Sequence, residues 1–191
     1  MAFIELSTLA GDTGGVALPV TASDRTVRRC RERGVELVLT PLSPSGLLQE
    51  AASGGVSFAS DQRGGYVFPG FLPAFDAAAA LARLVSLLEE SSTSLAEIVD
   101  ATPAMPIVEG EVATPMEQKG LVMRTLMEQL SDEGAELVLI DGIKVVSDQG
   151  WALVVPDPAD PVTHVWAEGA DVESSEALVA TYVERIARTL P

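Results

Sequence analysis

The chain of 191 residues is 47% hydrophobic, and its 28 acidic and 12 basic residues give it a formal net charge of −16. This length and apolar content are sufficient for a buried core in one or two domains. A surface so acidic repels nucleic acids and anionic lipids, so we expect neither as a partner.

The counts of cysteine and histidine and the lengths of the apolar runs narrow the class of protein further. Cys30 is the sole cysteine and His164 the sole histidine, which excludes an intrachain disulfide and a His/Cys metal cluster, and we predict no metal site. Apolar runs are too short to cross a bilayer, and the N-terminus lacks the basic segment of a signal peptide. We therefore expect a cytoplasmic protein that makes no contact with membranes.

Residues 1–91 alternate between strand and helix patterns. Short apolar segments predict strands at 16–20, 36–40 and 56–59. Capping residues and helical spacing predict helices at 23–33, 44–52 and 75–90. This alternation is typical of an α/β layer domain with a small, mixed or mostly parallel sheet.

A serine-rich run at residues 91–94 is the expected linker, which divides the chain into domains at 1–91 and 92–191. Ser94 and Glu97 then form a capping-box pattern that predicts a short helix. Thr114 and Glu117 form a second capping box, which predicts the start of a longer helix. The apolar stripe of this longer helix consists of Met123, Leu126, Met127 and Leu130.

The rest of the second half predicts an antiparallel α+β domain with helices on one face. Asp141-Gly142 is a strong hairpin signal between apolar segments at 136–140 and 143–146. Further strands are expected at 151–155 and 162–168. The final helix is expected to bury Val179, Tyr182, Val183 and Ile186.

The segment WALVVPDPADP, residues 151–161, is by itself a half-buried strand that runs into a proline-stiffened loop, with Trp151, Leu153 and Val155 on one face. Together with DGIKVVSDQG before it and VTHVWAEG after it, the segment resembles the last domain of the phosphohexomutases, the phosphomannomutase/phosphoglucomutase family. There the strand ends in Arg-x-Ser-Gly-Thr-Glu-Pro, and this loop holds the phosphate of the sugar phosphate. The resemblance implies a degenerate phosphate loop, whose family positions are Val155 for Arg, Asp157 for Ser, Pro158 for Gly, Ala159 for Thr, Asp160 for Glu, and Pro161 for Pro.

A second loop, SDQRGG at residues 60–65, resembles the family loop Gly-Glu-x-Ser/Asn-Gly-His/Gly, which contacts sugar hydroxyls. The resemblance implies substrate-binding positions at Asp61, Arg63, Gly64 and Gly65. Asp61 is one methylene shorter than the family glutamate. The alternative is an ordinary loop in which the glycines only permit a positive φ.

Three further features can be explained by structural roles alone. Arg25, Arg28 and Arg29 share a helix face, which suits contact with an anion or an acidic partner, or else simple solvation beside acidic neighbours. His164 has no adjacent serine or cysteine nucleophile, so we interpret it as a packed or hydrogen-bonded strand residue. Cys30 has no CxxC or histidine partner, so we interpret it as inert.

The resemblance extends over residues 15–188 and corresponds to the third and fourth domains of a phosphohexomutase. Catalysis in the family needs a phosphoserine on the first domain and an Asp-x-Asp-x-Asp magnesium site on the second, and this sequence contains neither. The resemblance therefore implies that this chain holds no cofactor and that its candidate ligand is a sugar phosphate. It also implies that the partner is the remaining domains of a longer chain. The expected function is the C-terminal portion of a phosphohexomutase-like protein that is not competent alone. The alternative is a structural or regulatory module attached to a sugar-1-phosphate nucleotidyltransferase of the mannose-1-phosphate guanylyltransferase type.

Overall fold

The computed structural model describes residues 1–11, 14–101 and 106–190, and it divides into two compact units, Met1–Ala104 and Met105–Pro191. Within the described residues, none of the helices combines the length and the hydrophobicity needed to span a membrane. Each unit is described by itself below.

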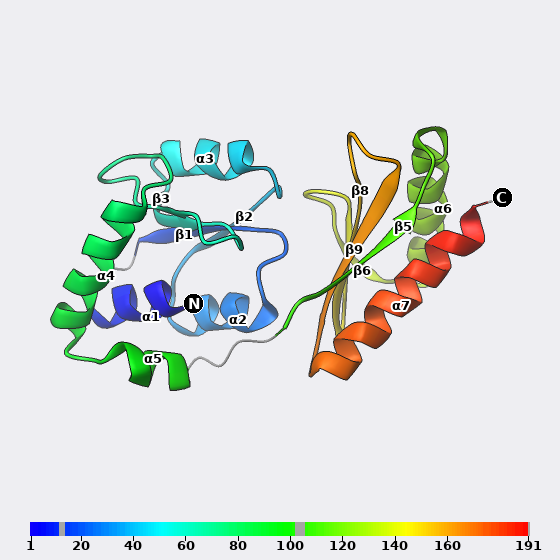
Figure 1. Cartoon of the computed structure of the whole chain (residues 1–191). Helices are drawn as coiled ribbons and strands as arrows, with labels where there is room; N and C mark the ends of the chain where they lie inside the picture. Colours follow the sequence, from blue (N-terminus) through cyan, green and yellow to red (C-terminus); the bar gives the residue numbers. More distant parts are fainter. Residues whose placement is uncertain (12–13, 102–105, 191) are drawn as a thin grey trace. The chain divides into compact units, whose positions relative to one another are not determined.

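The first unit is a mixed sheet with helices on both faces (Figure 1). Its strands are β1 (Gly15–Pro19), β2 (Leu37–Thr40), β3 (Val56–Ser60) and β4 (Tyr66–Val67). Its helices are α1 (Ala2–Leu9), α2 (Asp24–Glu32), α3 (Pro44–Ala52), α4 (Ala77–Ser91) and α5 (Leu95–Ala101). The strand order is β2-β1-β3-β4; β1 runs parallel to β2 and β3, and β4 runs antiparallel to β3. This confirms the predicted α/β layer.

The alternation of side chains along β1 explains why both faces of this sheet are covered. Val16 and Leu18 pack on the side of α1 and α2, whereas Ala17 packs with Leu47 and Ala51 of α3. Successive residues of a strand point to opposite faces, so an apolar run such as β1 belongs in a sheet buried on both sides.

Local capping signals place the helices of the first unit close to where the sequence predicts them. The Ser23 hydroxyl accepts a hydrogen bond from the Arg25 amide at 3.3 Å, and Ser43 caps α3, which has proline at its first turn. Asp76 caps α4 through the Ala79 amide at 2.9 Å. Such side chains satisfy amide groups that a helix start leaves without partners.

Helix α5 belongs to the first unit, although the sequence places it after the linker. Ile98 is buried in one cluster with Leu6 of α1 and Leu87 of α4. Ser94 and Glu97 form the predicted capping box, in which the Ser94 amide donates to the Glu97 carboxylate at 2.8 Å. The serine run at residues 91–94 therefore forms a bend, in which Ser92 has the left-handed conformation at φ 52°. The structure divides into its two units after Ala104 instead of after residue 91.

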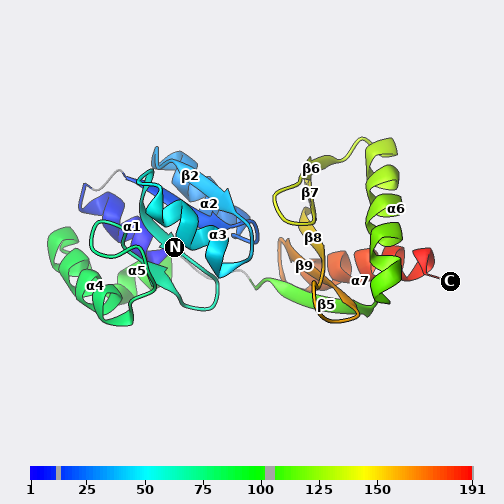
Figure 2. The same ribbon diagram turned by 90° about the horizontal axis from the view of Figure 1, so that it is seen from above.

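The second unit is an antiparallel sheet with helices on one face (Figure 2). Its strands are β5 (Val108–Ala113), β6 (Glu136–Val138), β7 (Ile143–Ser147), β8 (Gly150–Pro156) and β9 (Val162–Gly169), in the order β5-β9-β8-β7-β6. Its helices are η1 (Met116–Gln118), α6 (Lys119–Asp132) and α7 (Val172–Thr189). This confirms the predicted antiparallel α+β domain.

One apolar cluster joins α6 and α7 to the sheet. Leu126 and Leu130 of α6 and Ile186 of α7 pack against strand residues such as Val154 and Val165. Helix α7 approaches β5 so closely that a Cβ atom on Gly110 would lie 2.5 Å from Cγ1 of Val179. This glycine therefore sets the distance between α7 and β5.

Two local predictions in the second half are wrong, whereas the hairpin predicted at Asp141-Gly142 is confirmed. Thr114 does not cap a helix: it is fully buried, its amide donates to the Pro161 carbonyl at 2.7 Å, and its hydroxyl bonds the Val112 carbonyl. Strands β6 and β7 form the predicted antiparallel hairpin, and their last pair is Val138 with Lys144, so the connection is longer than Asp141-Gly142 alone. Strand β8 is buried on both faces from 151 to 154, not on one, because it lies in the middle of the sheet.

Candidate functional site: the loop between β8 and β9

Residues 157–161 connect β8 to β9, whose ladder ends at the pair Pro156 with Thr163. The loop therefore starts where a central strand leaves the sheet. Side chains and amides at the end of such a strand are held by a rigid frame, which is the usual way to position binding groups.

The loop is closed by the side chain of Asp157. Its Oδ1 atom accepts hydrogen bonds from the Ala159 amide at 2.8 Å and the Asp160 amide at 2.7 Å. The Asp157 amide itself donates to the Val162 carbonyl at 3.0 Å. The bonds from the Asp160 and Ala159 amides hold the pKa of the Asp157 carboxyl below its usual value. An internal carboxylate thus takes up the loop's amide donors.

The sequence offers no other donors within residues 157–161. Pro158 and Pro161 have no N–H group, and the side chains of Ala159 and both aspartates donate nothing at neutral pH. The amides of Ala159 and Asp160 bond Asp157 inside the loop, and the Asp157 amide bonds the Val162 carbonyl of β9. An added anion would therefore meet two carboxylates and no free amide.

Lys119, at the start of α6, anchors the loop through hydrogen bonds to its backbone. Its Nζ atom donates to the backbone carbonyls of Asp157 and Asp160, and the residue is 8% exposed. Sequence reasoning missed Lys119. A signal was present, because a lysine in the first turn opposes the helix dipole and so needs a local partner. The Lys119 ammonium is thus directed at carbonyl groups and not toward solvent.

His164 on β9 connects the loop to the edge strand β5. Its Nε2 atom lies 3.3 Å from Asp157 Oδ2, and its Nδ1 atom lies 3.5 Å from Glu109 Oε1. The ring stacks on Trp166 with 5.3 Å between centroids. The structure thus places His164 as a packed, hydrogen-bonded strand residue, as the sequence predicts.

The loop at residues 60–65 closes in a similar way. Asp61 Oδ1 accepts hydrogen bonds from the Arg63 amide at 2.9 Å and the Gly65 amide at 2.6 Å. Gly64 has φ +87°, which favours glycine, and a Cβ on Gly65 would lie 2.6 Å from the Phe75 ring. Backbone conformation and close packing therefore account for both glycines, while Arg63 lies exposed at the tip.

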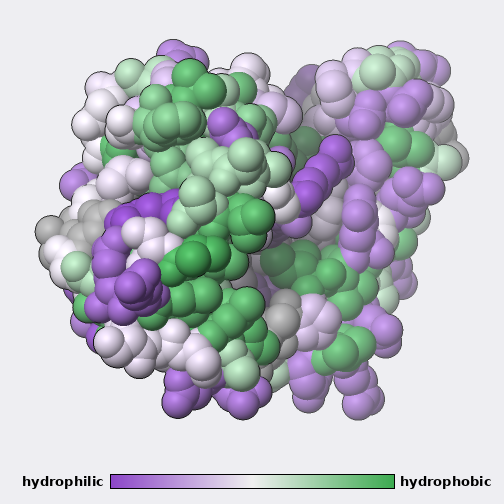
Figure 3. Space-filling model, turned by 60° about the vertical axis from the view of Figure 1, so that its left-hand side comes forward, coloured by the Kyte–Doolittle hydropathy of each residue, from purple (hydrophilic) through white to green (hydrophobic). Residues whose placement is uncertain are grey.

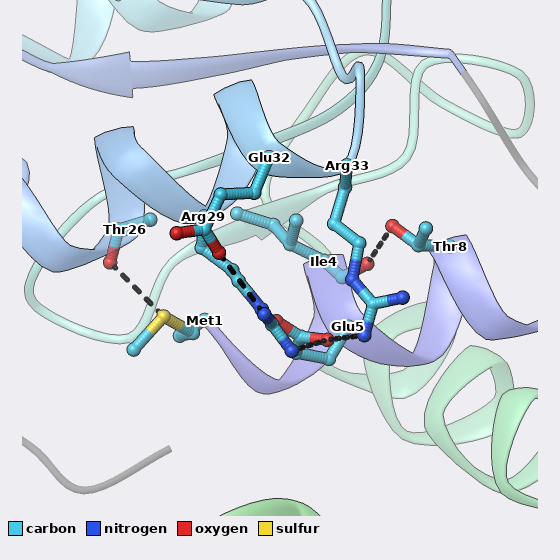
Figure 4. A network of polar contacts seen from close by, with 8 residues as sticks. All are labelled: Met1, Ile4, Glu5, Thr8, Thr26, Arg29, Glu32 and Arg33. Atoms are coloured by element: carbon cyan, nitrogen blue, oxygen red, sulfur yellow. Dashed lines mark hydrogen bonds and ion pairs between the residues drawn. The ribbon is translucent and has the colours of Figure 1, made fainter. Parts of the chain in front are cut away.

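The arginine-rich helix α2 uses part of its charge inside the first unit. The buried carboxylate of Glu5 on α1 bonds Arg29, with one contact at 3.2 Å, and Arg33 at 3.0 Å (Figure 4). Arg29 also reaches Glu32 at 3.2 Å, and the hydrogen bonds to Glu5 and Glu32 raise the pKa of Arg29. Cys30 is fully buried, and burial raises the pKa of its thiol, as expected for an inert cysteine.

The structure gathers these residues into local groups within each unit. Asp61, Arg63, Gly64 and Gly65 share one turn of the first unit, and Asp157 to Pro161 share one turn of the second. Among the residues from 1–11, 14–101 and 106–190, no group of three or more His, Cys, Asp or Glu is placed to hold a metal ion.

Comparison with known proteins identifies the first unit. A family model described as phosphoglucomutase/phosphomannomutase, alpha/beta/alpha domain III, matches residues 2–105, so that the match ends beside the division between the two units. The chain is 29% identical over 175 residues to the "Probable phosphoglucosamine mutase" of Methanopyrus kandleri, covering 92% of this chain and 39% of that protein. It is 26% identical over 156 residues to the phosphoglucosamine mutase of Mycolicibacterium smegmatis, covering 82% of this chain and 32% of that protein.

Solved structures share the fold of the whole chain. A phosphoglucomutase/phosphomannomutase family protein from Burkholderia thailandensis superposes with a TM-score of 0.73 at 21% identity, covering 99% of this chain and 40% of that one. N-acetylphosphoglucosamine mutase of Aspergillus fumigatus superposes with a TM-score of 0.68 at 12% identity, covering 98% of this chain and 42% of that one. The chain thus spans about two fifths of the length of these proteins. Because the family model covers more than half of it, the chain belongs to the phosphoglucomutase/phosphomannomutase family and corresponds to a C-terminal part of a phosphohexomutase.

Proposed function

We propose that this chain is the C-terminal portion of a cytoplasmic phosphohexomutase-like protein of carbohydrate metabolism and is not catalytically competent by itself. The observation that carries the proposal is the closed loop between β8 and β9, where Asp157 Oδ1 binds the Ala159 and Asp160 amides. A phosphate dianion needs several convergent donors, each contributing about 1.5–3 kcal/mol. The loop's own carboxylate supplies the negative charge that those amides would otherwise bind.

The rest of the sequence supports the same proposal. Neither the phosphoserine loop nor the Asp-x-Asp-x-Asp magnesium motif of the resemblance occurs in the 191 residues. Phosphoryl transfer without a nucleophile and a metal has no route to a stabilised transition state. We propose that these parts belong to the remaining domains of a longer chain, which is the partner of the two units.

The first test of this proposal is turnover. The purified chain is incubated with glucose, mannose or glucosamine 1-phosphate and a hexose bisphosphate primer, and the 6-phosphate is measured. We expect no product above a buffer control. Sustained turnover would show that the chain is a complete enzyme and would overturn the proposal.

The second test restores the loop. Val155→Arg, Asp157→Ser, Pro158→Gly and Ala159→Thr together return the cation, both hydroxyls and the flexible glycine, and they release two amides from Asp157. We expect this variant to bind mannose 1-phosphate by calorimetry, and the unmodified chain to bind none at millimolar concentration. The matched control is Val155→Arg alone, which adds the cation but leaves Asp157 in place, and it should bind none.

Two results would contradict the reasoning on the loop. Tight binding of mannose 1-phosphate by the unmodified chain would show that the closed loop opens readily. A restored variant that keeps the circular dichroism of the parent and binds nothing would show that the loop has no phosphate-binding ancestor.

The loop at residues 61–65 is assigned, in the same proposal, to the position of sugar contacts. Its exposed Arg63 and the Asp61 carboxylate offer a donor and an acceptor for hydroxyl groups. Titration with unphosphorylated mannose, which does not depend on the loop between β8 and β9, tests this assignment when it is followed by amide NMR. Shifts confined to residues 61–65 would support it, and an unchanged loop at saturating ligand would contradict it.

A second candidate function follows from the same closed loop. A mutase-like part that has lost phosphate binding can serve as a structural or regulatory module, attached to a sugar-1-phosphate nucleotidyltransferase of the mannose-1-phosphate guanylyltransferase type. The gene upstream of Met1 discriminates between the two. A serine phosphorylation loop with Asp-x-Asp-x-Asp indicates the mutase, and a nucleotidyltransferase signature indicates the module.

A further inference from the structure

The carboxyl ends of β1 and β3 form an edge of the first unit at which a ligand can bind. The two strands are adjacent and parallel, so their carboxyl ends lie side by side. The chain leaves β1 toward α2 and β2, on one side of β1, and it leaves β3 toward β4, on the other side. In open α/β sheets, ligands bind outside the carboxyl ends of two strands whose connections diverge in this way. The loop at residues 61–65 follows β3 at this edge.

The loop is joined to the segment that follows β1. The side-chain amide of Gln62 donates a hydrogen bond to the backbone carbonyl of Thr21. Thr21 is 1% exposed, and among the described residues its hydroxyl has no hydrogen-bond partner. A buried hydroxyl without a partner commonly marks a position that an ordered water or an ion completes. Gln62 therefore joins the two segments next to a polar atom that the chain itself leaves unsatisfied.

Within residues 61–65, Arg63 is the polar side chain that remains for a ligand. Asp61 uses its Oδ1 atom to bond the amides of Arg63 and Gly65, which leaves its Oδ2 atom as an acceptor. Gln62 is used to join the loop to the end of β1. Arg63 is exposed, and its guanidinium makes no hydrogen bond or ion pair with the part of the chain that the structure describes. The loop thus presents one cation on a backbone that its neighbours hold in place.

The apolar surface of the first unit offers no comparable group. Figure 3 shows hydrophobic residues gathered on the surface of this unit. A large groove between α3 and α4 has a mostly apolar wall. The charged side chains of that wall are already bonded, Asp76 to the Ala79 amide and Arg83 to Glu90. A charged ligand therefore finds a better partner in Arg63 than in this groove.

The chemistry of the guanidinium selects the class of ligand. Its planar set of N–H groups binds a carboxylate through two parallel hydrogen bonds, and its charge is permanent. A phosphate dianion needs several convergent donors, whereas this loop offers one cation beside the Asp61 carboxylate. Residues 1–91 carry 7 basic and 10 acidic residues, a net charge of −3, which disfavours a dianion more than a monoanion. A single carboxylate is therefore the better match.

We propose that Arg63 binds the carboxylate of a sugar acid, while the Oδ2 atom of Asp61 accepts a hydrogen bond from one of the sugar's hydroxyl groups. The inference rests on the proposed function, which assigns residues 61–65 to sugar contacts. It adds the class of the sugar, a monoanionic acid such as a hexuronate, in place of a neutral hexose.

The test is an amide NMR titration of the unmodified chain with sodium glucuronate, galacturonate and mannuronate, each compared with its neutral hexose at the same ionic strength. We expect at least one hexuronate to shift the amides of residues 61–65. Its Kd should be about five to ten times lower than that of the matching hexose, because its carboxylate pairs with a solvent-exposed guanidinium. Glucose 6-phosphate tests the phosphate as the alternative anion, and it should bind more weakly than that hexuronate.

Two variants separate the role of Arg63 from the effect of losing any positive charge. Arg63→Ser removes a guanidinium that makes no hydrogen bond or ion pair within the described residues, so the circular dichroism of the chain should not change. The preference for the hexuronate over the hexose should disappear. The matched control is Arg31→Ser, which removes another exposed arginine of the same unit, from α2, and it should leave the preference intact.

The outcomes distinguish this inference from the proposed function. A hexuronate that binds no more tightly than its hexose, with shifts at residues 61–65 in both titrations, would overturn the inference and leave the assignment of the loop to sugar contacts intact. A loop that shifts with none of these sugars would overturn both. Tighter binding of glucose 6-phosphate, or a preference that Arg63→Ser leaves unchanged, would overturn the inference alone.

Discussion

The contact between Glu5 and the arginines of α2 yields a quantitative prediction. The Glu5 side chain is 4% exposed, and it bonds Arg29 and Arg33, whose side chains are 36% and 33% exposed. Hydrogen bonds to charged groups contribute about 1.5–3 kcal/mol each. Solvent around the guanidinium groups reduces this, because both arginines can turn to water when the carboxylate is removed. We expect Glu5→Ala to lower the free energy of unfolding of the first unit by about 2–3 kcal/mol.

A matched control uses the same arginine. Glu32 also contacts Arg29, at 3.2 Å, but its side chain is 57% exposed and lies three residues further along the same helix. Such surface pairs contribute about 0.2–0.5 kcal/mol, so Glu32→Ala should be nearly neutral. The difference between the two variants isolates the effect of burying the carboxylate.

The assay must report on the first unit alone. Trp151 and Trp166 both lie in the second unit, so tryptophan fluorescence does not report on the first. Hydrogen exchange of the α1 and α2 peptides, read by mass spectrometry, measures opening of the first unit directly. Glu5→Ala should accelerate exchange in both helices and Glu32→Ala in neither. Equal effects of the two substitutions would refute the argument that the buried carboxylate holds α1 to α2.

Three further predictions concern the second unit. The pKa of Asp157 is held below its usual value, so the ionised carboxylate stabilises its loop above about pH 4. This stabilisation is lost as the pH falls through the pKa of Asp157 in the folded chain. Asp157→Asn should abolish the pH dependence in an NMR titration of the loop amides. Gly110→Ala should destabilise the unit by about 1–3 kcal/mol, because the added Cβ would clash with Val179. Gly120→Ala is the control: no atom lies near its added Cβ, so it should be neutral or stabilising. Urea unfolding followed by tryptophan fluorescence measures both variants. Lys119→Met should lower the free energy of unfolding by about 2 kcal/mol in the same assay, because two loop carbonyls lose a charged donor. An unchanged urea midpoint would contradict the role of Lys119 in anchoring the loop.

Elements with strong local signals could be predicted closely from the sequence. Helices α3 and α4 lie within two residues of their predicted bounds, because Ser43 and Asp76 supply side-chain caps. Helix α1 was not predicted, because no side chain caps its start and its stability comes from distant partners such as Leu87. Thr114 shows the opposite case: a local capping pattern was overruled by a backbone hydrogen bond to Pro161, just beyond the end of the β5–β9 ladder.

The candidate site divides in the same manner. The strand–loop–strand frame of residues 151–168 could be predicted, since it depends on alternation and on prolines that are visible in the sequence. The hydrogen bonds by which Asp157 closes the loop could not be predicted from the sequence, because an aspartate two or three residues before an amide can equally point to solvent. Lys119 lies 38 and 41 residues from the carbonyls it binds, and such separations leave no periodic trace.

The position of α1 has a consequence for how the first unit folds. An eight-residue helix is unstable in water by itself, and the partners of Glu5 lie 24 and 28 residues later in the chain. Leu6 packs against Leu87 and Ile98, which leave the ribosome long after it. We therefore expect helix α1 to dock only after α4 and α5 have been synthesised. Any recombinant version of the first unit must extend through α5, because a chain that stops at Ser91 lacks one of the side chains that Leu6 contacts.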